Sequence, residues 1–375
     1  MSELPRVLFV GRARLRFPLD RGLERRFDAL SNELDWRQLG TALDGRPPPD
    51  QRFALMRPFP VRLVDGLLWY LRLPRRVARE LRRFAPDAVI AQGAQETALA
   101  LVARRLARSD AKVVLDLHGD WHAPTRLYGS RARRLLDPFA DALARRALRR
   151  ADGVRTISAY TTELVRAAGI EPAAEFPAFM DLSSFTERPV AALPEAPRAL
   201  FVGVLERYKA FDVLVDAWRR VATELPGATL HVVGRGTLAP LAEALVAELP
   251  GRVEWSPALT ADGVAAALDA STLLVLASRS EGMGRVVIEA GCRGRAVVGS
   301  RVGGIPDVVA DGETGVLVPP GDAGALTASL VRVLADRELA ERLGSEGRKR
   351  VGPWVATPDE YARRVRALVD GVVGP

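Results

Sequence analysis

Two glutamates flanking a glycine-broken loop are the residues of this sequence whose types and spacing most clearly suggest chemistry. Glu281 and Glu289 lie eight positions apart, and Gly282 and Gly284 follow the first of them. The apolar run at residues 271–277 predicts a buried parallel strand before the loop, and the apolar positions after Gly284 predict a helix packed on that strand. A loop of this kind offers unpaired N–H groups and a positive helix end to an anion. We therefore expect an anion site at which one carboxylate addresses a sugar and the other reaches a diol.

The sequence around these glutamates resembles that of the retaining glycosyltransferases of family 4, which have the GT-B fold. The Glu-x7-Glu pattern is followed in register by GGIP at 303–306, DGETG at 311–315 and VPPGD at 318–322. Two glutamates at this spacing also occur by chance on solvated helices, but the ordered phrases make that interpretation the weaker one. The resemblance implies an enzyme that transfers a sugar from a nucleotide-diphosphate sugar, UDP- or GDP-linked, with retained stereochemistry.

The resemblance also implies roles for individual residues. Glu289 is expected to hold the ribose diol, the N–H groups of Arg285 and Val286 the diphosphate, and Glu281 the sugar. We expect catalytic roles for Glu281, His118 and Lys209. The expected donor-binding set is Gly11, Gly203, Arg207, Lys209, Met283, Gly284, Arg285, Val286 and Glu289.

Lys209 is the expected cation for the departing phosphate. It is one of three lysines in a chain that otherwise uses arginine, and Gly203, Leu205 and Lys209 align with a Gly-Arg-Leu-x3-Lys-Gly phrase of the family. Val204 stands where that phrase has arginine. Arg207 either replaces the missing cation or is an ordinary loop charge. A preorganised cation here would contribute on the order of 3 kcal/mol to stabilising the leaving group.

The first half of the chain carries a histidine at a strand end. His118 and Gly119 follow an apolar run at 112–117, and ligands of open parallel sheets gather at carboxyl ends of strands. The pair is similar to the family's His-Gly segment, which implies that His118 contacts the donor sugar. His122, in the same loop, is more simply structural. Near the first strand the family commonly has a diglycine turn, whereas this chain has Gly11 and then Arg12.

A second glycine turn leaves another class of function open. Gly234-Arg-Gly236 follows a predicted strand, opens a predicted helix and has Glu254 about twenty residues further on, so it imitates a dinucleotide fingerprint. The alternative to a transferase is therefore a dinucleotide-dependent oxidoreductase or a non-catalytic nucleotide-binding protein on the same sheets. A sugar phosphorylase is a lesser alternative. We expect no cofactor and no metal ion, because no cluster of ligand residues has metal-site spacing.

The chain of 375 residues is long enough for two domains. Strands and helices alternate in both halves, which predicts two doubly wound, Rossmann-like parallel sheets facing a cleft. The boundaries expected are 1–190 for an acceptor-binding domain, 198–352 for the donor-binding domain, and a linker at 190–197. A final helix at 358–372 is expected, by resemblance, to return to the first domain as part of a segment 357–375.

Several local features of the first half have a predicted structure. Residues 7–11, 87–92, 112–117 and 153–158 read as strands, and 22–34, 97–108 and 131–150 as helices. Loops are expected at 12–21 and, from its prolines, at 40–52. Residues 61–84 form an amphipathic stretch with seven arginines, which Pro74 should divide. This stretch either lies on a membrane interface or, as is commoner, covers its own core.

Charge and composition limit the partners. Residues 1–190 carry 33 basic and 23 acidic side chains and residues 191–375 carry 21 and 23, so the net charges are +10 and −2. The basic half fits an anionic membrane surface or a lipid-linked or phosphorylated acceptor, or else reflects an arginine-rich composition. A natural-product precursor is a further possible acceptor. No motif suggests nucleic acid binding. One cysteine and no signal-peptide layout lead us to expect a cytoplasmic protein.

Overall fold

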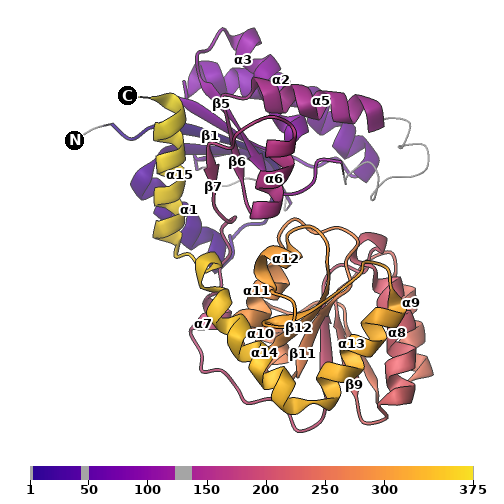
Figure 1. Ribbon diagram of the computed structural model, residues 1–375. Coiled ribbons are helices and arrows are strands. Elements are labelled where there is room, and N and C mark those ends of the chain that lie inside the picture. Colours follow the sequence, from indigo (N-terminus) through magenta and orange to yellow (C-terminus); the bar gives the residue numbers. More distant parts are fainter. Residues whose placement is uncertain (1–2, 44–49, 123–136, 375) are drawn as a thin grey trace. The chain divides into compact units, whose positions relative to one another are not determined.

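The computed structural model describes residues 3–43, 50–122 and 137–374. The chain forms two compact units, one of residues 1–181 with 356–375 and one of residues 182–355. Each unit is built on a parallel sheet with helices on both faces (Figure 1). The predicted class, two Rossmann-like domains, is confirmed.

The first unit contains a seven-stranded sheet with the order β3-β2-β1-β4-β5-β6-β7. Its strands are β1 (Arg6–Leu15), β2 (Asp35–Ala42), β3 (Phe53–Met56), β4 (Ala88–Gln92), β5 (Lys112–Leu117), β6 (Gly153–Thr156) and β7 (Ala174–Glu175). Its helices are α1 (Arg21–Glu33), α2 (Arg62–Arg83), α3 (Ala94–Ala107), α5 (Asp137–Arg150), α6 (Ala159–Ala167) and α15 (Pro358–Val373).

Alternate residues of β1 supply the two cores of this unit. Val7 and Phe9 pack with α1 and α15 on one face, and Leu8 and Val10 pack with α2 and α3 on the other. Successive side chains of a strand point to opposite faces, so a strand covered by helices on both sides reads as a continuous apolar run. The final helix is confirmed as part of the first unit.

Three expectations about the first unit are wrong. β1 continues to Leu15 through a register shift after Val10, so residues 12–15 of the loop expected at 12–21 are strand. β2 and β3 were not expected, and β2 includes residues 40–42 of the predicted loop. Pro74 does not divide α2, because the helix around it is anchored by the fully buried Leu73 and Val77.

Parts of two further expectations cannot be compared with the structure. Residues 44–49 of the predicted proline-rich loop and residues 131–136 of the predicted helix at 131–150 lie outside the described residues. The rest of that helix is α5. None of the helices among the described residues could span a lipid bilayer.

The second unit contains a six-stranded sheet with the order β10-β9-β8-β11-β12-β13. Its strands are β8 (Arg198–Val202), β9 (Thr229–Val233), β10 (Val253–Ser256), β11 (Leu273–Leu276), β12 (Ala296–Ser300) and β13 (Gly315–Val318). Its helices are α7 (Ser183–Thr186), α8 (Phe211–Glu224), α9 (Ala239–Glu248), α10 (Ala261–Asp269), α11 (Arg285–Cys292), α12 (Ile305–Val308), α13 (Ala323–Ala335) and α14 (Arg337–Arg350), with 3-10 turns η2 (Arg207–Lys209) and η3 (Gly352–Trp354).

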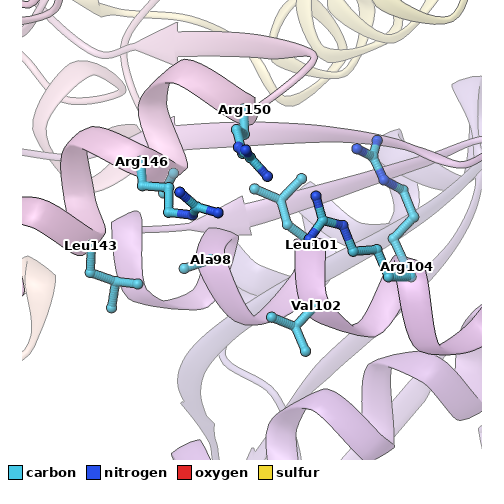
Figure 2. A pocket seen from close by; sticks show the side chains of 9 residues that line it. Ala98, Leu101, Val102, Arg104, Leu143, Arg146 and Arg150 are labelled. Carbon is cyan, nitrogen blue, oxygen red and sulfur yellow. The ribbon is translucent and has the colours of Figure 1, made fainter.

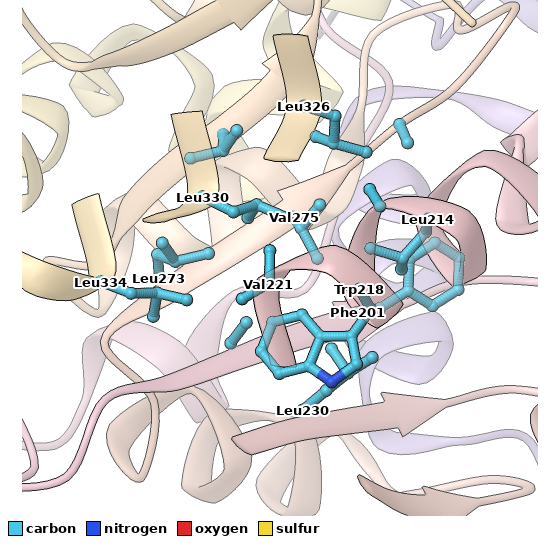
Figure 3. Close-up of a cluster of buried hydrophobic side chains, with 14 of the residues drawn as sticks. Phe201, Leu214, Trp218, Val221, Leu230, Leu273, Val275, Leu326, Leu330 and Leu334 are labelled. Carbon is cyan, nitrogen blue, oxygen red and sulfur yellow. The ribbon is translucent and has the colours of Figure 1, made fainter. Parts of the chain in front are cut away.

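The core on one face of this sheet is built around Trp218. Phe201 and Val275 from the strands and Leu214 and Leu330 from α8 and α13 belong with it to one cluster of buried side chains, which Figure 3 shows. These side chains are fully buried. The core fixes β8 and β11 side by side, so the loops at their carboxyl ends also lie side by side.

The segment expected as a linker is held by the second unit. Arg293 donates to the carbonyls of Phe185, Arg188 and Pro189, and Arg295 donates to those of Ala191 and Ala192. Both guanidinium groups are almost completely buried and are paired with Asp269. A buried arginine must have its donors satisfied, which fixes this stretch of backbone as part of the second unit.

Candidate functional site

The loop after β11 ends at an open helix terminus. Gly284 is the residue before α11, has a φ of 77°, and provides no side chain to cap the helix. Only glycine adopts this left-handed conformation without strain. The first N–H groups of α11 therefore remain available to an anion, as the strand-loop-helix pattern predicts.

The two glycines of the GGIP phrase pack against the backbone of this loop. A Cβ on Gly303 would lie 1.8 Å from the carbonyl oxygen of Glu281, and a Cβ on Gly304 would lie 2.3 Å from that of Gly282. Gly304 also donates its N–H to the Glu281 carbonyl at 3.1 Å. Any side chain at these two positions would displace the loop, so the glycines fix the backbone of Glu281.

Lys209 and Glu281 meet although they come from different loops. The Nζ of Lys209 donates to Oε2 of Glu281, and each side chain is 14% exposed. The hydroxyl of Ser278 donates to the same carboxylate oxygen at 3.4 Å. An ammonium and a carboxylate are thus held together at the carboxyl ends of β8 and β11.

Arg279 ties these two loops together. Its Nη1 and Nη2 atoms donate to the two carboxylate oxygens of Asp212 at 2.7 and 2.8 Å, and Nη1 also donates to the carbonyl of Arg207 at 2.6 Å. Its backbone N–H donates to the carbonyl of Tyr208 at 2.7 Å. This bidentate contact fixes η2, and with it the position of Lys209 relative to the Glu281 loop.

Glu289 lies on the inner face of α11 and is buried. Its Oε1 accepts a hydrogen bond from Nε of Arg285, one helical turn earlier, at 2.7 Å. Burial raises the pKa of the Glu289 carboxyl, and the charge and hydrogen bond of Arg285 oppose that shift. The Arg285 side chain is 54% exposed, so it caps the carboxylate from the solvent side.

These groups line one cavity of the second unit, with a volume of about 370 Å³. Lys209, Glu281 and Glu289 contribute its charged groups together with Arg285. Its remaining lining residues are Phe185, Val202, Leu259, Ala261, Val264, Gly284 and Val286. Pockets of roughly 300–1,000 Å³ with an apolar lining and a few convergent polar groups are typical ligand sites.

Three expected donor-site residues of the second unit do not line this cavity. Gly203 directly follows β8, and Met283 is a buried residue of the Glu281 loop itself. Arg207 is exposed and lies two residues before Lys209, at the start of η2. Whether Arg207 supplies the missing cation or is an ordinary loop charge stays a prediction.

In the first unit, His118 is held by two neighbours. Its Nε2 lies 2.8 Å from Oδ2 of Asp116, and its Nδ1 lies 3.3 Å from the side-chain nitrogen of Gln92. The other oxygen of Asp116 accepts from the buried Arg155 at 2.6 Å. Burial opposes ionisation of Asp116, but the charges of Arg155 and His118 outweigh it and keep the pKa of that carboxyl well below its ordinary value.

Gly11 is adjacent to this group. A Cβ on Gly11 would lie 2.9 Å from Oε1 of Gln92, so the glycine lets the Gln92 side chain lie against β1. Gly11, Gln92 and His118 therefore gather on the neighbouring strands β1, β4 and β5. His122 instead lies 2.9 Å from Asp120 of its own loop and 3.7 Å from Asp141 of α5. The substrate roles of Gly11 and His118 stay predictions.

At the second glycine turn, the space beside Gly234 and Gly236 is occupied by the backbone of Gly203 and Leu205. A Cβ on Gly234 would lie 1.8 Å from the carbonyl oxygen of Gly203, and one on Gly236 would lie 2.4 Å from that of Leu205. Glu254, the expected ribose ligand of a dinucleotide, is paired with Arg198 at 2.6 Å. The glycines serve backbone packing, which removes the main observation behind the dinucleotide alternative.

Sequence reasoning missed three kinds of site residue. Gln92, Asp116 and Arg155 orient His118, and only the positions of Gln92 and Asp116 at strand ends could have indicated them. Arg279 lies in the loop of the Glu281 motif, but its contact with Asp212 was not predicted. The apolar walls at Val202, Leu259 and Val264 carry no chemical signal in the sequence.

Comparison with known proteins gives a family match in each of the two units. Residues 21–177 match the family model "Glycosyltransferase Family 4", and residues 196–336 match "Glycosyl transferases group 1". The alpha-D-kanosaminyltransferase of Streptomyces kanamyceticus is 26% identical over 74% of this chain and 75% of its own length. The D-inositol 3-phosphate glycosyltransferase of Segniliparus rotundus is 33% identical over 48% of this chain and 41% of its own.

The solved structure of sucrose-phosphate synthase from Thermosynechococcus elongatus superposes with a TM-score of 0.77, covering 98% of this chain and 99% of its own at 22% identity. This likeness establishes the fold. Three curated relatives that are 33 to 34% identical to the chain are matched over only 30 to 42% of their own lengths. With family models matching both units and the fold of the solved structures, the chain belongs to glycosyltransferase family 4 and has the GT-B fold.

Proposed function

We propose that this protein is a retaining glycosyltransferase that takes a sugar from a nucleoside-diphosphate sugar and passes it to a hydroxyl acceptor. The observation that carries the proposal is the single cavity lined by Lys209, Glu281, Glu289 and the open end of α11. A nucleotide sugar presents a diol, a diphosphate and a hexose in sequence. The cavity offers a matching carboxylate, a cationic and N–H-rich centre, and a second carboxylate.

In the proposed complex, Glu289 accepts hydrogen bonds from the two ribose hydroxyls. Arg285 occupies only Oε1 in the described residues, so Oε2 is available. The diphosphate lies against the N–H groups of Arg285 and Val286 and contacts the ammonium of Lys209. In the structure this ammonium is paired with Glu281. The base lies on the apolar side of the cavity, against Val202, Leu259 and Val264.

The proposed chemistry is a displacement on one face of the sugar. The bond between the anomeric carbon and the diphosphate oxygen breaks, and the charge that builds on the leaving oxygen is stabilised by Lys209 and the α11 terminus. The acceptor oxygen forms its bond to the same carbon from the face that the diphosphate leaves. The acceptor proton passes to a diphosphate oxygen, so no protein base is required.

The finer assignments belong to the same proposal. The donor is a UDP- or GDP-sugar, no metal ion or cofactor is needed, and His118 contacts the transferred sugar. The acceptor is a lipid-linked or phosphorylated glycan or a natural-product precursor. Its phosphorylated form is supported by the name of the D-inositol 3-phosphate relative and by the basic first half of the chain.

Contact with an anionic membrane and a cytoplasmic location are also proposed. Most of α2 covers its own core through Trp69, Leu73 and Val77, but Leu67 and Leu71 are 61% and 63% exposed. Sedimentation with vesicles, with and without anionic lipid, tests this contact. Equal binding to neutral and anionic vesicles, or no binding, would dispose of it.

The donor proposal is tested by the thermal stability of the protein with UDP, GDP, ADP and NAD. A bound nucleotide stabilises the folded state in proportion to its affinity, so UDP or GDP should raise the melting temperature. Stabilisation by NAD alone would favour the oxidoreductase alternative. Product analysis with free phosphate as the acceptor separates a transferase from a sugar phosphorylase.

A further inference from the structure

The first unit contains a second cavity, away from its strand ends, between α3 and α5. It has a volume of about 120 Å³, and the described residues that line it all belong to these two helices. Ala98 and Leu101 of α3 and Ala147 of α5 form its apolar wall. A cavity of roughly 150 Å³ accommodates a benzene ring, so this one has room for a short hydrocarbon segment.

Arginines surround this apolar wall. Arg104, Arg105, Arg146 and Arg150 line the cavity, and no acidic residue does. Figure 2 shows Arg104, Arg146 and Arg150 around the space beside Ala98 and Leu101. Like charges this close repel one another unless an anion lies between them.

Among the described residues, only one of these four cations has a protein partner. Arg104 donates to Asp152 and to the carbonyl of Ala111. In the described part of the chain, the side chains of Arg105, Arg146 and Arg150 make no ion pair or hydrogen bond. Three guanidinium groups without a partner among the described residues thus line an apolar hollow. Planar guanidinium groups bind phosphate oxygens through pairs of hydrogen bonds.

The apolar surface extends beyond the hollow. Val102 and Leu106 lie one turn apart on α3 and are 46% and 55% exposed, and Phe139 and Leu143 lie one turn apart on α5 and are 76% and 40% exposed. Val102 and Leu143 also line the cavity. Apolar side chains beside a cationic rim can cover a hydrocarbon chain that is too long for the hollow itself.

We propose that this cavity is a binding site for an alkyl phosphate, with the phosphate on Arg105, Arg146 and Arg150 and the start of the chain against Ala98 and Leu101. An inorganic anion would leave the apolar wall unused, and a neutral hydrocarbon would leave the arginines unpaired. The proposal rests on the first unit alone. It is therefore independent of the donor cavity in the second unit.

The test compares two double variants of the full-length protein. Arg146→Gln with Arg150→Gln removes two rim cations, and Arg145→Gln with Arg149→Gln removes the same charge from α5 at positions that do not line the cavity. Calorimetric titration uses monomeric decyl phosphate, with decanol and inorganic phosphate as probes that lack the charge or the chain. Unchanged melting temperatures establish that both variants fold.

We expect saturable binding of decyl phosphate, tighter than that of either partial probe. The rim variant, Arg146→Gln with Arg150→Gln, should weaken the binding of decyl phosphate by about tenfold or more, because charge-assisted hydrogen bonds are lost. The control variant should leave this binding nearly unchanged.

A second experiment uses phosphatidylcholine vesicles with and without phosphatidic acid. If only the rim variant loses binding to vesicles with phosphatidic acid, the ligand of the site is a membrane lipid. If the protein binds monomeric decyl phosphate but not the vesicles, the ligand is an alkyl phosphate dissolved in water. Equal effects of the two variants in both experiments, or inorganic phosphate binding as tightly as decyl phosphate, would overturn the site.

Discussion

Nε of Arg285 lies 2.7 Å from Oε1 of Glu289, so the guanidinium of one residue covers the buried carboxylate of the other across one turn of α11. The Glu289 side chain is only 9% exposed, whereas that of Arg285 is 54% exposed. The cavity thus holds a carboxylate that is costly to ionise and is stabilised by a solvent-facing cation. Such an arrangement suits a group that must accept hydrogen bonds from a ligand.

Nucleotide binding should depend on pH through Glu289. Burial raises the pKa of Glu289 above its ordinary value of 4.5, and the proposed ribose contact requires the ionised form. Nucleotide affinity should therefore decrease on acidification, beginning at a higher pH than an exposed glutamate would give. In Glu289→Gln this dependence should largely disappear, as measured by calorimetry across the acidic range. An identical pH profile in the variant would remove Glu289 from nucleotide binding.

The same shift has a consequence for stability. A carboxyl whose folded pKa is raised contributes stability that is present below its unfolded pKa and is lost as pH rises through the folded value. Glu289→Gln should therefore be more stable than the native protein at neutral pH, and the difference should shrink as pH falls. Thermal unfolding at a series of pH values measures it. A less stable variant at neutral pH would mean that the Arg285 contact outweighs the cost of burial.

Lys209→Ala should lower kcat on the order of hundredfold, because it removes a preorganised cation from the departing phosphate. The fold should persist, since the side chain packs at a cavity rather than in the core. Lys349→Ala is the matched control, because Lys349 pairs with Glu346 and is 70% exposed. Steady-state kinetics with a competent donor and acceptor make the comparison. Equal rates in the two variants would mean that Lys209 takes no part in turnover.

Arg279 does not line the cavity, but Arg279→Ala should lower kcat by roughly tenfold. Displacing a catalytic group by about 1 Å can lower the rate up to about hundredfold. Loss of the Arg279 side chain frees η2 and so moves Lys209. In the double variant with Lys209→Ala, the Arg279→Ala change should lower kcat almost no further. A residue with a purely structural role would lower kcat in both backgrounds. Arg219→Ala, which breaks a bidentate pair with Glu248 on exposed surface, serves as the control. Additive effects of the two changes would contradict the positioning role.

Asp116→Asn should destabilise the first unit by about 3 kcal/mol, because the buried Arg155 would lose its charged partner. The pKa of Asp116 is lowered from 3.8, so its contribution is present above that pH and is lost as pH falls through the folded value. Asp110→Asn changes an exposed residue and serves as the control. Calorimetric unfolding at neutral and acidic pH measures both variants. Equal melting temperatures for the two at neutral pH would show that the Arg155 pair contributes little.

The local structure around Glu281 and Glu289 could be predicted because several short-range requirements agree. An apolar strand, a glycine that adopts a positive φ and an apolar helix face leave few alternatives. The glycines of GGIP were recognised by resemblance, and the contacts of Gly303 and Gly304 with the Glu281 loop give their physical reason.

Other features depend on tertiary packing that the sequence does not display. The proline at 74 is tolerated because α2 is held by its buried face. The extension of β1 past Gly11 depends on pairing with β2, which is distant in sequence. The exposed position of Arg207 follows from the direction of a short 3-10 turn, and spacing alone does not determine that direction.

The central claim is that Glu289 and its cavity bind a nucleoside diphosphate. Its most direct test is calorimetric titration of UDP and GDP into the native protein and into Glu289→Ala. We predict binding of one of the two nucleotides and a loss of about tenfold or more in the variant, because two hydrogen bonds to a charged group disappear. Affinities that are the same in the variant and the native protein, for whichever nucleotide binds, would contradict the account.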